Sequence, residues 1–161
     1  MVKNIFMEPV MHFKPIKEFL AYIEECHLAL ADLYLRLSLE AEDENVKLLL
    51  NFMRNKEQLS FFHLHEYAEQ APSSLLETWL DNIFDQSFPM KCQQMKTQPN
   101  LSIEDVVALA MKFDMQLIEL TQTTAYNSPT IEAELALENI SNQEEEALHQ
   151  VVIASHEFDY M

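Results

Sequence analysis

In the segment Met53-Arg54-Asn55-Lys56-Glu57-Gln58-Leu59-Ser60-Phe61-Phe62-His63-Leu64, one carboxylate stands in the middle of an apolar helical stripe. The stripe advances in steps of three and four residues, as one face of a helix does. It consists of Val46, Leu50, Met53, Glu57, Ser60, Leu64 and Tyr67. Its two central positions, Glu57 and Ser60, are polar where a packed helix usually buries apolar side chains. We interpret Glu57 as part of a polar layer inside an apolar core.

Three other apolar stripes each carry one ionisable residue near the midpoint: His27, Asp114 and Glu144. Helices packed side by side would bring these three groups and Glu57 to the same level of a bundle. Burying them without compensation costs on the order of several kcal/mol per charge. Protons, mutual hydrogen bonds, water or a cation must therefore neutralise the layer. Carboxylates and an imidazole are also ligands that iron, manganese or zinc accept.

The composition of the 161-residue chain indicates one all-α domain, residues 1–161. Glycine is absent, which excludes glycine-rich phosphate loops and nucleophile elbows. The net charge of −17 would repel nucleic acid and anionic membranes, so we expect neither as a partner. Two cysteines make no disulfide framework, and no apolar signal segment or membrane span is found. These features predict a cytoplasmic protein.

The order of the predicted helices follows from breaks in the stripes. Residues 1–14 have no clear period and are predicted to form an arm. The main helices are predicted over 15–41, 44–70, 103–126 and 129–157, with a crossover over 71–102. The short turn after the first helix makes the first pair an antiparallel hairpin, whereas the crossover is long enough to run the length of a bundle.

Local residues indicate where these helices begin. Asp43 and Ser102 are predicted N-caps, and proline suits the first turn at Pro15 and, after Asn127-Ser128, at Pro129. The crossover contains three prolines, which exclude one long helix there. Within it, the segment from Ser73 to Asp81 is predicted to be a short helix, with Trp79 anchoring the crossover to the bundle.

The paired helical segments resemble the ferritin-like superfamily, in its rubrerythrin-type branch. The first hairpin is similar through Ile23-Glu24-Glu25-Cys26-His27 and Phe52-Met53-Arg54-Asn55-Lys56-Glu57-Gln58-Leu59-Ser60. The second is similar through Ala108-Leu109-Ala110-Met111-Lys112-Phe113-Asp114 and Ile140-Ser141-Asn142-Gln143-Glu144. The resemblance implies a ferritin-like four-helix bundle of two helical hairpins with a crossover. It also implies a metal site of two iron or manganese ions, held by glutamates and two Glu-x-x-His motifs.

When the family's metal ligands are carried over by position, this chain lacks several of them. Glu57 and Glu144 match family glutamates, and Asp114 is a shortened form of a third. His27 stands where a glutamate is expected, while Ser60 and Ala147 stand where both histidines are expected. We therefore expect a divergent, non-catalytic ferritin-like protein with a metal-free polar core and no cofactor. The alternative is an oxidoreductase or metalloprotein that binds a single iron or manganese ion through His27, Glu57, Asp114 and Glu144.

Two weaker features remain open in the sequence. Glu146 and His149 form a literal Glu-x-x-His, but Glu146 lies about 120° from the buried stripe, so they could act as ligands only if the helix were rotated. A solvated pair is the simpler interpretation. The outward Leu28, Leu35 and Leu39 and the pair Phe61-Phe62 indicate a second apolar surface. It could pack under the crossover or form a homodimer interface.

Overall fold

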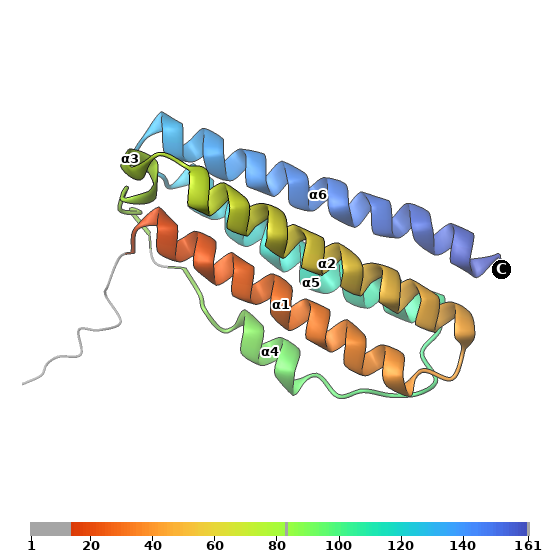
Figure 1. Cartoon of the computed structure of the whole chain (residues 1–161). Helices are drawn as coiled ribbons and strands as arrows, with labels where there is room; N and C mark the ends of the chain where they lie inside the picture. Colours follow the sequence, from red (N-terminus) through yellow and green to blue (C-terminus); the bar gives the residue numbers. More distant parts are fainter. Residues whose placement is uncertain (1–13, 83, 161) are drawn as a thin grey trace, which may run out of the picture.

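The computed structural model describes residues 14–82 and 84–160, which form an all-α bundle (Figure 1). Its helices are α1 (Ile16–Glu40), α2 (Glu44–Gln70), α3 (Ser73–Leu76), α4 (Phe88–Gln94), α5 (Ile103–Tyr126) and α6 (Ile131–Asp159). The long helices form two hairpins, α1 with α2 and α5 with α6, and α2 joins the hairpins through contacts with α6 and α5. The predicted fold class is confirmed. Within the described ranges, no helix is long and apolar enough to cross a membrane.

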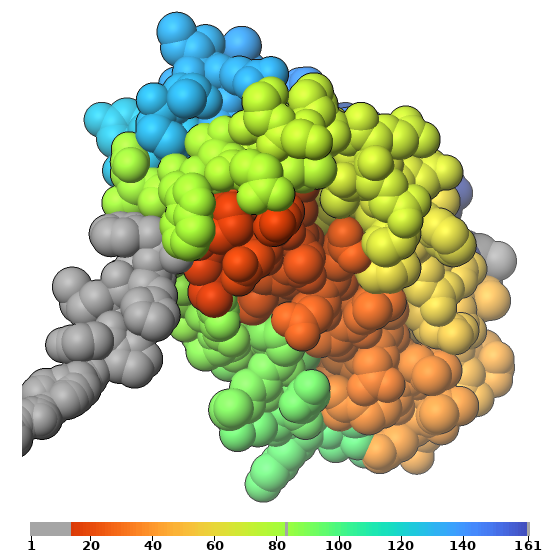
Figure 2. Space-filling model, turned by 60° about the vertical axis from the view of Figure 1, so that its left-hand side comes forward, coloured from red at the N-terminus to blue at the C-terminus, as the bar shows by residue number. Residues whose placement is uncertain are grey.

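The helix α1 is the most enclosed part of the bundle. The apolar residues that recur at helical spacing along it are all buried: Ile16, Leu20, Ile23, Leu30, Tyr34 and Leu37. Residues beside this stripe are buried too, such as Phe19, Cys26 and Leu33. A second buried side exists because α2 covers one flank of α1 and α4 packs on another. Figure 2 shows the red and orange surface of α1 between the yellow α2 and the green crossover. Residues 1–13 of the predicted arm lie outside the described residues.

The helix ends follow the expected capping chemistry with one exception. Asp43 accepts hydrogen bonds from the backbone of Asn45 and Val46, and Ser102 forms a reciprocal capping box with Asp105. The prediction that the last helix spans 129–157 was wrong by two residues at each end, since α6 begins at Ile131 and ends at Asp159. Thr130 is the N-cap, because its backbone is extended and its hydroxyl accepts from the backbone N–H of Ala133.

The predicted crossover runs along α1 to the far end of the bundle (Figure 1), where Glu42 N donates to Pro99 O over 3.0 Å. The predicted short helix from Ser73 to Asp81 is wrong in extent, because α3 ends at Leu76. The chain then becomes extended and pairs with the start of α1 through hydrogen bonds from Ile16 N to Thr78 O and from Leu80 N to Lys14 O.

The prediction that Trp79 anchors the crossover was also wrong. Its side chain is 60% exposed, whereas the neighbouring Leu80 is 2% exposed and fills the core. The sequence analysis missed α4, although Pro89 in its first turn is a recognised helix-start signal. Backbone pairing near Trp79 and packing of α4 therefore fix the crossover instead.

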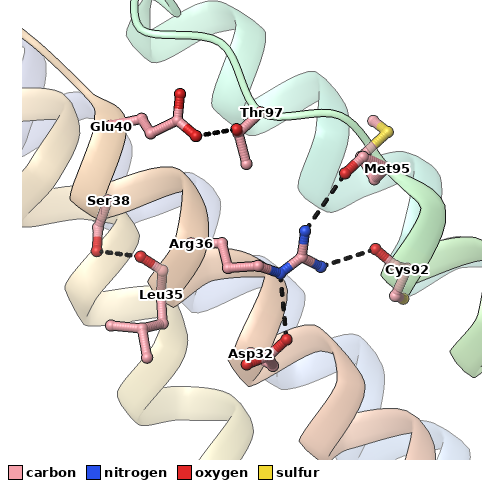
Figure 3. Close-up of polar contacts among 8 residues, drawn as sticks. All are labelled: Asp32, Leu35, Arg36, Ser38, Glu40, Cys92, Met95 and Thr97. Carbon is pink, nitrogen blue, oxygen red and sulfur yellow. Dashed lines mark hydrogen bonds and ion pairs between the residues drawn. The ribbon is translucent and has the colours of Figure 1, made fainter.

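One arginine joins the crossover to α1. Arg36 pairs with Asp32 one turn earlier on α1, and its two terminal nitrogens donate to Cys92 O over 3.0 Å and to Met95 O over 3.3 Å (Figure 3). These carbonyls belong to the C-terminal end of α4, where the negative end of the helix dipole favours a cation; Cys92 O also accepts from the backbone N–H of Met95 over 3.3 Å. Figure 3 also shows Thr97 donating to Glu40 further along the crossover. Arg36 thus caps α4 and holds it on α1.

We predict that Arg36→Lys loosens the crossover, because an ammonium keeps the charge but cannot form the same two-pronged contact. The free energy of unfolding in urea should fall by about 1–2 kcal/mol, and amide hydrogen exchange should accelerate over residues 88–98. Lys47→Ala, which removes an exposed pair with Glu44, serves as the control and should change neither. Equal exchange in the Arg36 variant and the parent would contradict this role.

Candidate functional site

The centre of the bundle holds His27 between two carboxylates. On α1, His27 presents Nδ1 to Glu57 Oε1 of α2 at 2.7 Å and Nε2 to Glu144 Oε2 of α6 at 3.6 Å. The first distance is that of a charge-assisted hydrogen bond, whereas the second is an ion pair. The three side chains are only 8%, 10% and 9% exposed. Helix packing therefore brings these predicted residues together out of water.

This geometry favours a charged His27 ring. Burial alone lowers the pKa of His27, but the interactions with Glu144 and Glu57 outweigh burial and raise the pKa to about 10. The imidazole is therefore protonated at neutral pH. A charged ring has N–H donors on both sides, which suits its position between two carboxylates.

Asp114 of α5 completes the layer. It lines one small cavity together with His27, Glu57 and Glu144, so the structure brings all four predicted residues to one place. Burial raises the pKa of Asp114 well above its ordinary value, and the charge of Glu57 adds to this while His27 opposes it. Burial also raises the pKa of Glu144, again opposed by His27. Burial therefore favours the protonated form of both carboxyl groups, whereas the charge of His27 favours the ionised form.

Some polar atoms at this level lack a protein partner. Among the described residues, neither carboxylate oxygen of Glu144 accepts a hydrogen bond, and the buried hydroxyl of Tyr34 has no partner. The cavity beside Glu144 measures about 10 Å³ and is lined also by Ser60, Leu117 and Ala147. That volume is close to the minimum that holds one water molecule. Buried acceptors without donors are costly, so a small hydrogen-bond donor suits this cavity.

A larger cleft lies outside the cavity, between α2 and α6. Its volume is about 210 Å³. Its lining residues are His27, Lys56, Leu59, Ser60, His63, Leu64, Ile140, Gln143, Glu144, Glu146, Ala147 and Gln150. Four of these, His27, Ser60, Glu144 and Ala147, also line the inner cavity, so the two spaces adjoin. The cleft, which polar and apolar side chains line together, therefore leads from the surface towards the carboxylate layer.

Part of the cleft rim is a polar chain between the two helices. Lys56 of α2 donates to the side chain of Gln150, and Gln150 donates to Glu146 over 3.3 Å, both on α6. The sequence analysis did not predict this chain or the cleft. A signal was present, because Ser60 and Ala147 are small residues three positions after Glu57 and Glu144 on the same faces.

The other candidate ligands lie at the surface. Glu146 and His149 are exposed, so the helix rotation that would make them ligands does not occur. His63 and His65 of α2 are also exposed. His65 pairs with Glu24 over 3.1 Å and Glu69 over 3.5 Å. The hydrogen bond to Glu24 raises the pKa of His65.

Comparison with known proteins supports the fold but little more. No family model matches the sequence, and no curated protein matches it significantly. A solved structure from Thermotoga maritima, described as a ferritin-like diiron-carboxylate protein, is similar with a TM-score of 0.59 over 91% of this chain and 97% of that chain. The sequences are 15% identical. The similarity shows that the fold of this chain is ferritin-like.

The side chains of this chain do not fit a dinuclear metal centre as they are arranged. Within residues 14–82 and 84–160, no group of three or more histidine, cysteine, aspartate or glutamate side chains is disposed to hold a metal ion. His27 engages Glu57 directly, and Ser60 and Ala147 supply no nitrogen donor. Two ions, each with several ligands about 2 Å away, also need more space than a cavity of about 10 Å³.

The charged ring of His27 predicts a pH dependence of stability. Because folding raises the pKa of His27 from 6.5 to about 10, its stabilising charge is fully present below about pH 6.5 and is lost as the pH rises through about 10. Glu57→Gln should lower this pKa and reduce the fall in unfolding free energy between neutral pH and about pH 10 by about 1–3 kcal/mol.

Urea unfolding across this pH range measures the effect. Glu66→Gln removes an exposed charge from the same helix, so it controls for the general repulsion in an acidic protein. It should keep the parent pH dependence. If the unfolding free energy of Glu57→Gln falls as much between neutral pH and about pH 10 as that of the parent and the control, the pair of His27 and Glu57 does not set the pKa of His27.

Proposed function

We propose that this chain is a non-catalytic ferritin-like protein that acts by binding, with a polar core neutralised by His27 and by protons instead of metal ions. The observation that carries this proposal is the position of the His27 ring between Glu57 and Glu144. In a ferritin-like metal site, carboxylates converge on cations. Here a protonated side chain of the protein supplies the positive charge at that level.

The side chains available as metal ligands support the same proposal. Redox chemistry at a dinuclear site depends on two ions that are held by enough ligands of fixed geometry. In this chain, the position three residues after Glu57 is Ser60, and the position three residues after Glu144 is Ala147. A metal ion that used Glu57 would also have to displace a hydrogen bond of 2.7 Å from His27. The site is therefore better suited to holding protons than to holding a reactive metal pair.

A second function, binding of a single iron or manganese ion, has one observation in its favour. Both oxygens of Glu144 lack hydrogen-bond partners, and Glu144 shares a cavity with His27, Glu57 and Asp114. For such an ion to bind through His27, the ring would have to lose a proton and at least one of its carboxylate contacts. This requirement makes the metal-free core the stronger proposal.

Two further expectations concern the cellular location and the oligomeric state of the protein. The described cysteines, Cys26 and Cys92, are buried free thiols, which supports a cytoplasmic location. Leu28 and Phe62 are 45% and 61% exposed, so the crossover does not cover them. Their exposure supports a homodimer as a further proposal.

We predict that protein purified without chelator carries iron, manganese or zinc far below one ion per chain, as measured by elemental mass spectrometry. Incubation with ferrous or manganous ion followed by desalting should not raise this value. An Asp114→Asn, Glu144→Gln variant is the matched control, because it removes carboxylate ligands without changing side-chain size. Stoichiometric metal in the parent that disappears in this variant would overturn the proposal in favour of the single-ion site.

A further inference from the structure

We propose that the cleft between α2 and α6 binds a small primary alkylammonium compound, with its charged head against the carboxylate layer and its apolar tail between the two helices. This inference rests on the proposed function, because a metal ion at the same level would engage Glu144. It adds a class of ligand to that function.

The two adjoining spaces match such a molecule in size. The inner cavity of about 10 Å³ has room for one water-sized group, and an ammonium nitrogen with its protons is comparable in size to a water molecule. The outer cleft of about 210 Å³ is smaller than most drug-binding pockets, so a short chain of carbon atoms fits it better than a ring system. Ser60 and Ala147 line both spaces, and their small side chains lie where the head would pass.

The balance of donors and acceptors selects a ligand that donates hydrogen bonds. Two donors near the cleft are engaged, His27 Nδ1 with Glu57 and Lys56 with Gln150. The carboxylate of Glu144 still has acceptor capacity, because neither of its buried oxygens accepts a hydrogen bond and His27 Nε2 lies 3.6 Å from Oε2, beyond hydrogen-bond distance. A primary ammonium has three N–H donors, enough to satisfy both oxygens. A carboxylate ligand would add acceptors where acceptors are already in excess.

The charge at the inner end of the cleft also favours a cation. The inner cavity is faced by the carboxyl groups of Glu57, Asp114 and Glu144 and by the single ring of His27. The outer cleft adds Lys56, Glu146 and His63. The net charge of −17 on the whole chain attracts cations from solution. A bound ammonium would bring the charge of the layer closer to balance.

The walls of the cleft provide the apolar contact for the tail. Leu59 and Leu64 line it from α2, and Ile140 and Ala147 line it from α6. Leu59 is 48% exposed, so covering it with a ligand removes apolar surface from water. Ammonium ion alone lacks this contribution and should bind more weakly than an alkylammonium.

The test is a titration of isotopically labelled protein, kept in chelator, with n-butylammonium chloride, followed by amide NMR shifts. Sodium butyrate, n-butanol and ammonium chloride are the comparison ligands. Butylammonium should give saturable shifts in residues around Ser60 and Ala147, with a Kd of roughly 1 mM or lower. The three comparison ligands should bind at least about tenfold more weakly, since each lacks either the charge or the tail.

Two variants locate the site. Glu144→Gln should weaken butylammonium binding by about tenfold or more, whereas Glu145→Gln, an exposed neighbour on α6, should leave it unchanged. Ala147→Leu keeps the carboxylate of Glu144 but fills the cleft, so it should also abolish butylammonium binding. It serves as the test if Glu144→Gln does not fold.

Three results would overturn the inference. The first is that butylammonium gives no saturable shift at concentrations about tenfold above that Kd. The second is that butyrate binds as tightly as butylammonium. The third is that butylammonium binding is unchanged in both Glu144→Gln and Ala147→Leu. Because the titration uses chelated protein, these results leave the proposed metal-free core standing. Bound metal found before chelation would instead count against the proposed function, whereas the titration of chelated protein tests ligand binding separately.

Discussion

The 2.7 Å hydrogen bond between His27 and Glu57 joins α1 to α2 at the level where the core of the bundle is polar. Carboxylates can be buried at that level only if positive charge, protons or hydrogen bonds compensate for lost water. His27 supplies the charge from within the protein, with Glu144 on its other side. Burial raises the pKa of Asp114 and of Glu144, which favours the protonated form of each carboxyl group. The four long helices therefore meet at a layer of ionisable side chains whose charges must be compensated as the helices pack.

The rest of the fold packs α4 against one side of α1 and leaves a cleft open between α2 and α6. α4 packs against α1, and Arg36 holds it there by capping its C-terminal end. Between α2 and α6, the small side chains of Ser60 and Ala147 instead leave a cleft that reaches the layer. Ser60 and Ala147 stand three positions after Glu57 and Glu144, so small side chains next to the carboxylates account for the open space.

The polar layer could be predicted from sequence because helical periodicity assigns each residue to a face. The midpoints of the four stripes are His27, Glu57, Asp114 and Glu144, and hairpin packing with a crossover brings midpoints together. The crossover was predicted less well, because its structure depends on contacts with distant residues. Local pattern suggested a helix through Trp79, but backbone pairing with the start of α1 ended that helix at Leu76. The cleft could not be predicted from chemically active residues, because it exists where the side chains of Ser60 and Ala147 are small.

The charge of the His27 ring is the quantity on which this account depends most directly. Nitrogen-15 NMR of the histidine ring nitrogens measures it, at about pH 8, between the ordinary histidine pKa and the raised value of about 10. The ring signals can be assigned by their loss in His27→Gln. Both ring nitrogens of His27 should carry a proton at this pH. A neutral ring, with one protonated and one unprotonated nitrogen, would contradict this prediction and would leave His27 free to act as a metal ligand.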